Sequence, residues 1–178
     1  MQLGLQVRAF DDIPRLDLAI DGADEVAPDF WLVKGGGAAH TREKLVAAAA
    51  DRFVVIVDSS KVVNAIRGPI PLELMAFGLA GTLARLGEVT LRAVPPSPDG
   101  GVIADYHGPV GDPAELAIRL STTPGVVDHG LFGPWMVSEV VVGEVVVGEV
   151  VDGDQGRAYW LERKGSASTR PSTQGAPR

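Results

Sequence analysis

One stretch of this chain concentrates side chains that could move protons and offset the charge that proton movement creates. Its members are three closely spaced carboxylates, a lysine and a further glutamate: Asp21, Asp24, Glu25, Lys34 and Glu43. A positioned carboxylate can act as a general base, and a lysine or backbone N–H groups can stabilise negative charge developing on a substrate. We therefore interpret the stretch as an active site for proton transfer.

A run of glycines lies inside this stretch. Gly35, Gly36 and Gly37 follow Lys34 directly. Glycines let backbone N–H groups approach an anion, and a following helix adds its dipole. The run is not a dinucleotide fingerprint, because His40 stands where a third glycine is needed, and not a P-loop, because the lysine precedes the glycines. A flexible strand-to-helix connector remains the alternative.

Each residue also has an ordinary interpretation. Aspartates such as Asp21 and Asp24 often cap turns, and a magnesium site is a further alternative for them. Lysines are usually solvated, so Lys61 is ambiguous alone, as is a lone glutamate such as Glu43. His40 is expected at the surface or behind the site rather than as a base.

The expected elements place these residues at strand ends. The apolar run at 52–58 predicts a strand buried on both faces, as in parallel sheets. Open α/β sheets bind ligands at the carboxyl ends of their strands, where the polar residues fall. The expected elements of this part are strands at 1–10, 17–20, 30–33 and 52–58, and a helix at 44–51.

The pattern of the second half of the sequence predicts a compact α+β unit. Its order of helix, strand, strand, helix and strand is typical of a ferredoxin-like fold. The expected elements are helices at 72–86 and 112–121 and strands at 89–94, 102–106 and 126–127. Residues 140–149 repeat Val-Val-Val-Gly-Glu in tandem, and one copy is expected to be a last strand of the first domain.

Composition and charge argue against several kinds of partner and site. The 178 residues allow one large or two small domains, and the net charge of -7 argues against a nucleic-acid or membrane partner. No cysteine is present, and the three histidines lack zinc spacing, so neither disulfides nor a metal site is expected. No run reaches membrane-spanning length and no signal pattern opens the chain, which fits a cytoplasmic protein.

Four spaced motifs together resemble ribose-5-phosphate isomerase type A. They are Asp-Gly-Ala-Asp-Glu at 21–25, Lys-Gly-Gly-Gly-Ala at 34–38, Thr-Arg-Glu-Lys at 41–44 and Asp-Ser-Ser-Lys at 58–61. The resemblance implies a partial open parallel-sheet (Rossmann-like) α/β domain with an inserted ferredoxin-like α+β lid. The implied division is an α/β domain at 1–67 and 130–163 and a lid at 68–129. The polar composition of residues 164–178, without an apolar pattern, predicts a disordered tail.

The resemblance also implies roles. The family interconverts ribose 5-phosphate and ribulose 5-phosphate without metal or cofactor, through an enediol in the pentose phosphate pathway. Glu43 would be the general base, with Asp21, Asp24 and Lys34 as further catalytic residues. A cytoplasmic homodimer acting on a small sugar phosphate is expected. The implied substrate-binding residues are Asp21, Gly22, Ala23, Asp24, Lys34, Gly35, Gly36, Gly37 and Lys61.

The chain departs from the family at its start. Family members begin with another βαβ unit carrying a phosphate-binding loop, and the ten residues before Asp11 are too few for a unit of about 30. We therefore expect a fragment or a shortened protein with an incomplete site. A non-catalytic sugar-phosphate-binding module, an inactive fragment and a magnesium-dependent phosphohydrolase using Asp21 and Asp24 are the alternatives.

Overall fold

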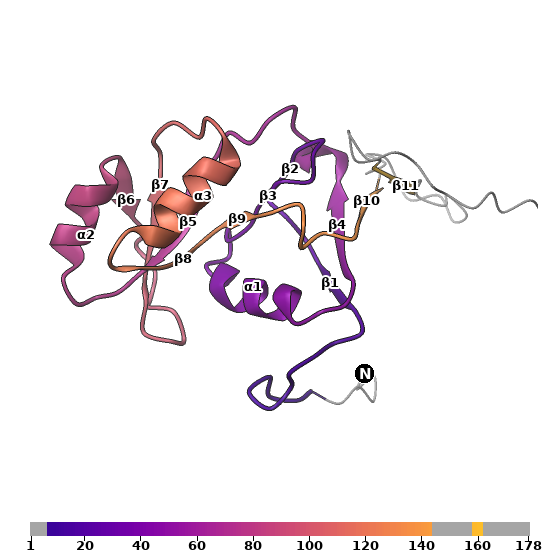
Figure 1. Ribbon diagram of the computed structural model, residues 1–178, viewed down its shortest axis with the longest axis horizontal. Helices are drawn as coiled ribbons and strands as arrows, with labels where there is room; N and C mark the ends of the chain where they lie inside the picture. The colour runs from indigo at the N-terminus through magenta and orange to yellow at the C-terminus, as the bar shows by residue number, and fades with distance from the viewer. Residues whose placement is uncertain (1–6, 144–157, 162–178) are drawn as a thin grey trace, which may run out of the picture.

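The computed structural model of the chain describes residues 7–143 and 158–161 (Figure 1). The helices are α1 (His40–Ala48), α2 (Leu79–Leu86) and α3 (Pro113–Thr122), with a 3-10 turn η1 (Ser59–Lys61). The strands are β1 (Ala19–Asp21), β2 (Glu25–Val26), β3 (Leu32–Val33), β4 (Phe53–Asp58), β5 (Ile70–Leu74), β6 (Val89–Leu91), β7 (Val102–Tyr106), β8 (Val126–His129), β9 (Leu131–Phe132), β10 (Glu139–Gly143) and β11 (Ala158–Trp160). In these residues no helix has the length and apolarity needed to cross a bilayer.

A parallel sheet forms one end of the molecule. Its order is β1-β4-β10-β11, with β1 and β10 both parallel to β4 and β11 antiparallel at the edge. β10 contains the valines of the first Val-Val-Val-Gly-Glu copy, which confirms the strand expected there, whereas the second copy lies outside the described residues. The predicted parallel-sheet fold class is confirmed.

The described residues cover the two faces of this sheet unequally. Phe53 and Val55 of β4 are buried against the α1 side, in a core that includes Ala47. Ile20 and Ile56 point to the opposite face and are 58% and 51% exposed. The prediction of a strand buried on both faces is therefore wrong for the carboxyl half of β4. Successive side chains of a strand alternate between faces, and α1 packs on one of them.

The second sheet is ferredoxin-like, as predicted. Its order is β6-β7-β5-β8, every neighbouring pair is antiparallel, and α2 and α3 complete a strand-helix-strand-strand-helix-strand sequence. This unit lies at the other end of the molecule, with α1 between the two sheets (Figure 1). Asp112 caps α3 as expected, since its carboxylate accepts hydrogen bonds from the amides of Ala114 and Glu115.

The helix expected at 72–86 is wrong in its first part. Residues Ile70–Leu74 form β5, a central strand of the antiparallel sheet, and α2 begins only at Leu79. Leu72 and Leu74 are fully buried in the ferredoxin-like core, while Glu73 lies between them. Alternation over five residues is too short to compete with the helical spacing of the leucines that follow.

Other elements also differ from the sequence expectations. Residues 7–10 form no strand, and residues 1–6 lie outside the described part. α1 begins at His40 rather than Lys44. β2, which was not expected, pairs with β3 and β9 in a small three-stranded sheet. A strand of two residues leaves no periodic signal. The domain boundaries at 67 and 129 remain a prediction, and the tail at 164–178 is outside the described residues.

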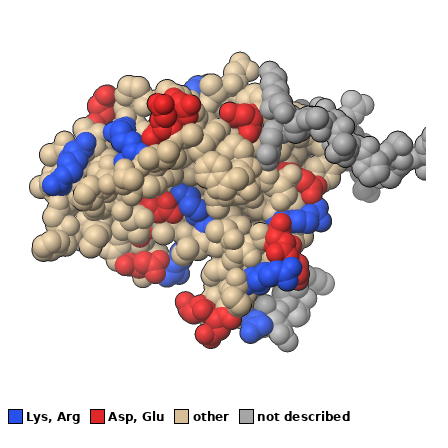
Figure 2. All heavy atoms as spheres, viewed as in Figure 1, with Lys and Arg blue, Asp and Glu red and all other residues tan. Residues whose placement is uncertain are grey.

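Charged side chains are interspersed over the surface. On the face shown in Figure 2, acidic and basic groups alternate over the described residues instead of gathering by sign. That face offers no continuous basic strip of the kind that follows a nucleic-acid backbone.

Candidate active site

Lys34 is the centre of the predicted site. Its side chain follows β3 and is only 4% exposed. Its ammonium lies 2.9 Å from Asp21 Oδ2 and 3.2 Å from Glu43 Oε2, and donates to the Gly22 carbonyl at 2.6 Å. A buried cation needs such partners to offset its lost hydration. Lys34 therefore joins the end of β1 to the start of α1.

Three elements set this geometry. β1 ends at Asp21, and the first hydrogen bond of α1, from Glu43 N to Ala39 O at 3.0 Å, fixes Glu43 in the first turn. The Lys34 amide donates to Gly130 O at 2.9 Å, which ties the end of β3 to the strand connection beyond β8. The amino-terminal turn of a helix favours a carboxylate, which suits the position of Glu43.

The glycine run forms a tight loop around Asp24. Gly36 N donates to Asp24 Oδ2 at 2.7 Å, and a Cβ built on Gly36 would lie 2.8 Å from Asp24 Oδ1. Gly35 has φ +111°, and a Cβ there would lie 2.7 Å from His40 Nδ1. Glycine is required at both positions. The Gly36 amide thus binds the Asp24 carboxylate in the way that the amides of an anion-binding loop bind their ligand.

The three neighbouring carboxylates point to different partners. Asp21 binds Lys34, Asp24 binds the Gly36 amide, and Glu25 accepts from the Arg67 amide at 2.8 Å. Their mutual repulsion is therefore relieved without a shared cation. Within the described ranges, no three His, Cys, Asp or Glu side chains come together in a group that could hold a metal ion.

Lys61 lies beside a hollow at the carboxyl ends of the parallel strands. The hollow has a volume of about 510 Å³, and Lys61 shares it with Gly22 and Ala23. The remaining lining residues are Ile56, Val57, Asp58, Val141 and Gly143. Lys34 and Glu43 do not line the hollow, which is linked to them through Gly22, whose carbonyl contacts Lys34. Hydrogen bonds from the hydroxyl and amide of Ser60 hold the pKa of Asp58 below its ordinary value.

Arg92 is a functional candidate that sequence reasoning missed. It follows β6 and donates from Nη1 to the carbonyls of Gly35 at 2.7 Å and Gly36 at 3.1 Å. Its other nitrogens bind both oxygens of Asp105, at 2.8 and 2.7 Å, and Asp105 raises the pKa of the guanidinium. The ferredoxin-like unit therefore holds the glycine loop. No local signal marks an arginine 56 residues beyond the loop it binds.

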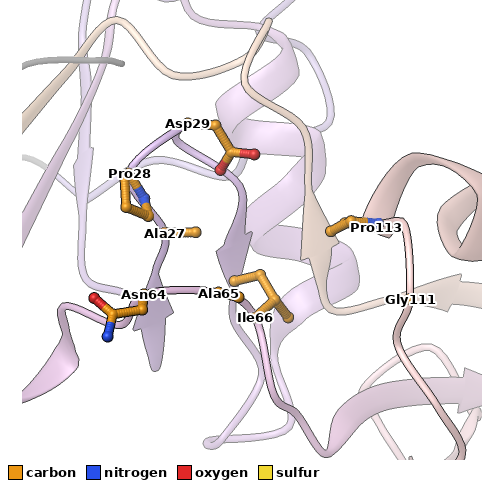
Figure 3. Close-up of a pocket in the computed structure, with 8 residues that line it drawn as sticks. All are labelled: Ala27, Pro28, Asp29, Asn64, Ala65, Ile66, Gly111 and Pro113. Atoms are coloured by element: carbon orange, nitrogen blue, oxygen red, sulfur yellow. The ribbon is translucent and has the colours of Figure 1, made fainter.

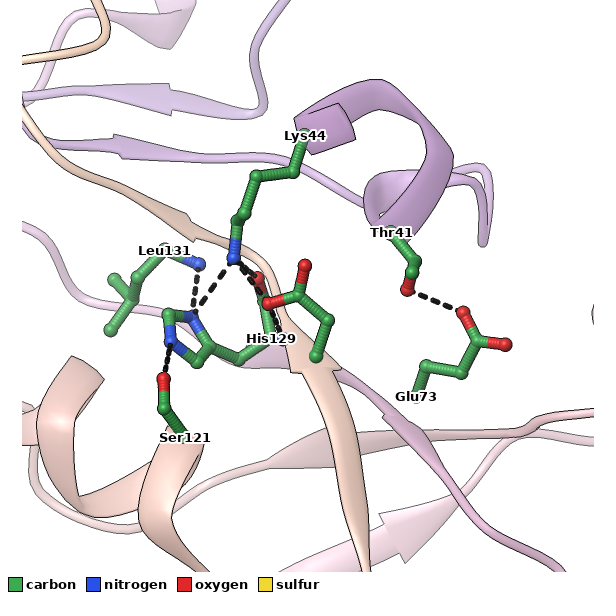
Figure 4. A network of polar contacts seen from close by, with 7 residues as sticks. Thr41, Lys44, Glu73, Ser121, His129 and Leu131 are labelled. Carbon is green, nitrogen blue, oxygen red and sulfur yellow. Dashed lines mark hydrogen bonds and ion pairs between the residues drawn. The ribbon is translucent and has the colours of Figure 1, made fainter. Parts of the chain in front are cut away.

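A second missed group lies behind α1 (Figure 4). His40 is fully buried, so of its two expected positions the surface is excluded and the place behind the site remains, and burial lowers its pKa. His129 is also buried, and burial and the nearby Lys44 lower its pKa to about 4. Burial lowers the pKa of Lys44 as well, although Asp128 opposes that shift. His40 and Lys44 lie on α1 and Asp128 and His129 lie at the end of β8, so only the tertiary structure brings them together.

A separate hollow of about 300 Å³ lies near the start of α3 (Figure 3). None of the predicted site residues lines it. Its lining residues are Ala27, Pro28, Asp29, Asn64, Ala65, Ile66, Gly111 and Pro113.

The family model for ribose 5-phosphate isomerase A (phosphoriboisomerase A) matches residues 1–145. The chain belongs to this family. A ribose-5-phosphate isomerase A from Nitrobacter hamburgensis is 44% identical over 146 residues, a match covering 72% of this chain and 63% of that protein. The enzyme of the same name from Prochlorococcus marinus is 42% identical over 145 residues, covering 74% of this chain and 61% of that protein. The chain thus spans somewhat over three fifths of each relative's length.

Solved structures of ribose 5-phosphate isomerases share the fold. The enzyme from Methanocaldococcus jannaschii has a TM-score of 0.70 and 32% identity, over 82% of this chain and 66% of that one. A D-ribose-5-phosphate isomerase solved in complex with phospho-erythronic acid has a TM-score of 0.75 and 32% identity, over 88% of this chain and 69% of that one. The predicted family resemblance is confirmed.

Proposed function

We propose that this chain interconverts ribose 5-phosphate and ribulose 5-phosphate, with Glu43 as the general base. The observation that carries the proposal is the pairing of Glu43 with the buried Lys34 ammonium, 3.2 Å away, beside the hollow at the strand ends. Apart from this ion pair, Glu43 Oε2 is buried and receives no hydrogen bond from the described residues, which suits a base that takes a proton from substrate. The membership of the isomerase A family supports the substrate.

The proposed reaction moves one proton between neighbouring carbons. Glu43 removes the proton from C2 of the open-chain aldose, and the electrons of that bond form an enediolate as negative charge collects on O1. Lys34 stabilises that charge. Glu43 then returns the proton to C1, while the O2 hydroxyl loses its proton and O1 gains one, which gives the ketose. The scheme uses neither metal nor cofactor, and Asp21 keeps Lys34 oriented toward Glu43.

We propose the same role for the rest of the predicted substrate site. Asp24 and the Gly35–Gly37 loop would bind sugar hydroxyls, and Lys61 would offer a cation in the hollow linked through Gly22; the contact of the loop with Asp24 and the place of Lys61 in the hollow support this. The neighbour solved with phospho-erythronic acid, a phosphorylated sugar acid, supports a ligand of this class. We further propose that the chain forms a homodimer, which light scattering on the purified chain would test. We also propose a cytoplasmic location.

Glu43→Gln tests the base. We expect the formation of ribulose 5-phosphate to fall by about 10²- to 10⁴-fold, because the amide cannot accept the proton. The matched control is Glu115→Gln, an exposed glutamate in the first turn of α3, which should retain wild-type activity. Equal activity in the wild type and Glu43→Gln would remove Glu43 from the role of base.

Calorimetric titration with ribose 5-phosphate separates the alternative functions. Binding without turnover in the wild type would support a non-catalytic sugar-phosphate-binding module, and neither binding nor turnover would support an inactive fragment. Phosphate release that EDTA abolishes would support a magnesium-dependent phosphohydrolase instead.

A further inference from the structure

The helix that carries Glu43 has little local support of its own. α1 is nine residues long, and its N-cap residue, Ala39, makes no side-chain capping hydrogen bond. Helices of this length are not stable alone in water. Its buried residues are only His40 and Ala47. The position of Glu43 must therefore come from contacts between α1 and the rest of the fold.

Lys44 makes the most substantial of these contacts (Figure 4). Its ammonium lies 2.6 Å from Asp128 Oδ1, donates to the carbonyl of His129 and lies 3.5 Å from His129 Nδ1. The Lys44 and Asp128 side chains are 17% and 21% exposed, so this ion pair is poorly screened by water. Adjacent helical residues point about 100° apart, so Lys44 faces β8 while Glu43 faces Lys34.

Thr41 adds a second contact on the same side of α1. Its hydroxyl donates to the buried carboxylate of Glu73 in β5, which also accepts from the Ser97 hydroxyl. Arg42, in contrast, pairs with Asp99 at the surface, where both side chains are more than half exposed. Exposed pairs contribute little to stability. The first turn of α1 is thus held by the ferredoxin-like unit through buried contacts.

One short segment, residues 128–132, contacts both Lys34 and the helix that carries Glu43. Asp128 and His129 bind Lys44, while Gly130 O accepts the Lys34 amide at 2.9 Å. The Phe132 ring then lies under both cations, 5.6 Å from Lys34 Nζ and 5.1 Å from Lys44 Nζ. The segment therefore fixes α1 and Lys34 to a common support.

We propose that Lys44 is a positioning residue for Glu43, which sets the distance between the Glu43 carboxylate and Lys34 by fixing α1 to residues 128–132. The effect of Lys44 on catalysis rests on the proposed isomerase function. The attachment of α1 to residues 128–132 does not, because these contacts exist whatever reaction the chain catalyses.

Lys44→Met tests the structural part by amide hydrogen exchange. Methionine keeps the apolar stem and removes the ammonium. We expect the amides of α1 to exchange at least tenfold faster than in the wild type, while those of β5 and β7 are unchanged. Arg42→Met is the matched control, since it removes a cation from the same turn whose pair is exposed, and its exchange should match the wild type. Unchanged protection of α1 in Lys44→Met would overturn the proposal, whether or not the wild type is active.

Steady-state kinetics test the catalytic part. We expect kcat of Lys44→Met to fall ten- to a hundredfold with KM changed less than about threefold, because a base displaced by about 1 Å costs up to about 10²-fold. Lys44→Arg, which keeps a cation in reach of Asp128, should recover much of the loss. The double variant Lys44→Met/Asp128→Asn also removes the partly buried carboxylate that Lys44→Met leaves unpaired. It should therefore fold more readily than Lys44→Met and show the same loss of kcat. Wild-type kcat in both methionine variants would overturn the catalytic part, and an inactive wild type would count against the proposed function alone.

Discussion

At the scale of single residues, the site depends on one buried cation. Lys34 is the only described lysine placed between two carboxylates of the predicted set, and it contacts Asp21 and Glu43 from a side chain that is 4% exposed. The sequence marked all three residues and suggested that Lys34 offsets the carboxylates at 21–25, but it did not give the pairing of Lys34 with Glu43. Lys34 and Glu43 act as a unit in the proposed mechanism, because the base produces the charge that the ammonium stabilises.

Lys34→Met is expected to lower kcat by about 10²- to 10³-fold, the usual cost of removing one group that stabilises developing charge. Stability should fall by about 1 to 3 kcal/mol, because the variant leaves Asp21 and Glu43 without their cation, although both retain some access to water. Urea unfolding and steady-state kinetics measure the two effects.

The double variant Lys34→Met/Glu43→Gln is the decisive comparison. Since the two residues act together, it should be about as slow as the slower single variant. Losses in kcat that multiply across the two single variants would show instead that the residues act independently.

At the scale of elements, the glycine loop is held from the ferredoxin-like unit. Arg92 is bound on one side to Asp105 and on the other to the carbonyls of Gly35 and Gly36, and both members of its ion pair are 18% exposed. The loop amides can keep a fixed direction because their carbonyl sides are held. A strand-to-helix connector alone would lack this restraint.

Arg92→Met is expected to destabilise the fold by about 1 to 3 kcal/mol, because it leaves the Asp105 carboxylate and two carbonyls without their donor. The Gly36 amide should also exchange faster with solvent. Arg92→Lys should recover only part of the stability, since an ammonium cannot reproduce the fork of a guanidinium. Chemical denaturation and amide exchange check both points, with the exposed Arg85→Met as control. Equal stability of Arg92→Met and Arg85→Met would contradict the role of Arg92.

At the scale of the whole molecule, a buried polar cluster joins α1 to the ferredoxin-like unit. His129 accepts the Leu131 amide at Nδ1, 3.2 Å away, and its Nε2 lies 3.0 Å from the Ser121 hydroxyl. This arrangement suits the neutral ring. A second proton would displace the Leu131 amide and place a positive charge beside Lys44, which lies 3.5 Å from Nδ1.

Protonation of His129 should make the folded protein less stable in acid. Burial and Lys44 lower the pKa of His129 from 6.5 to about 4, so between these values the unfolded chain binds more protons than the folded one. Stability therefore rises with pH through this window, and this histidine removes up to about 3 kcal/mol as pH falls from 6.5 to 4.

Urea unfolding of the wild type and His129→Gln at pH 7 and pH 4.5 measures this effect. Glutamine cannot take up a proton, and carboxylates contribute equally to both proteins. The wild type should therefore lose more stability than the variant between the two pH values. The same loss in both proteins would remove His129 as the cause.

The sequence by itself determined the family, the parallel-sheet and ferredoxin-like fold classes, and the identity of the residues around Lys34. These follow from local signals: glycines that a tight loop requires, a capped helix at Asp112, and motif spacing along one stretch. β2 escaped prediction because two residues show no period, and β5 because the helical spacing of the leucines that follow outweighed its own short pattern.

The tertiary structure alone decided which groups meet. It paired Lys34 with Glu43 and Asp21, left Ile56 exposed, and buried His40 between elements that are far apart in sequence. It also brought Arg92 onto the glycine loop. Such contacts depend on how two sheets pack against α1, and no local pattern encodes the distance between atoms that lie on different elements.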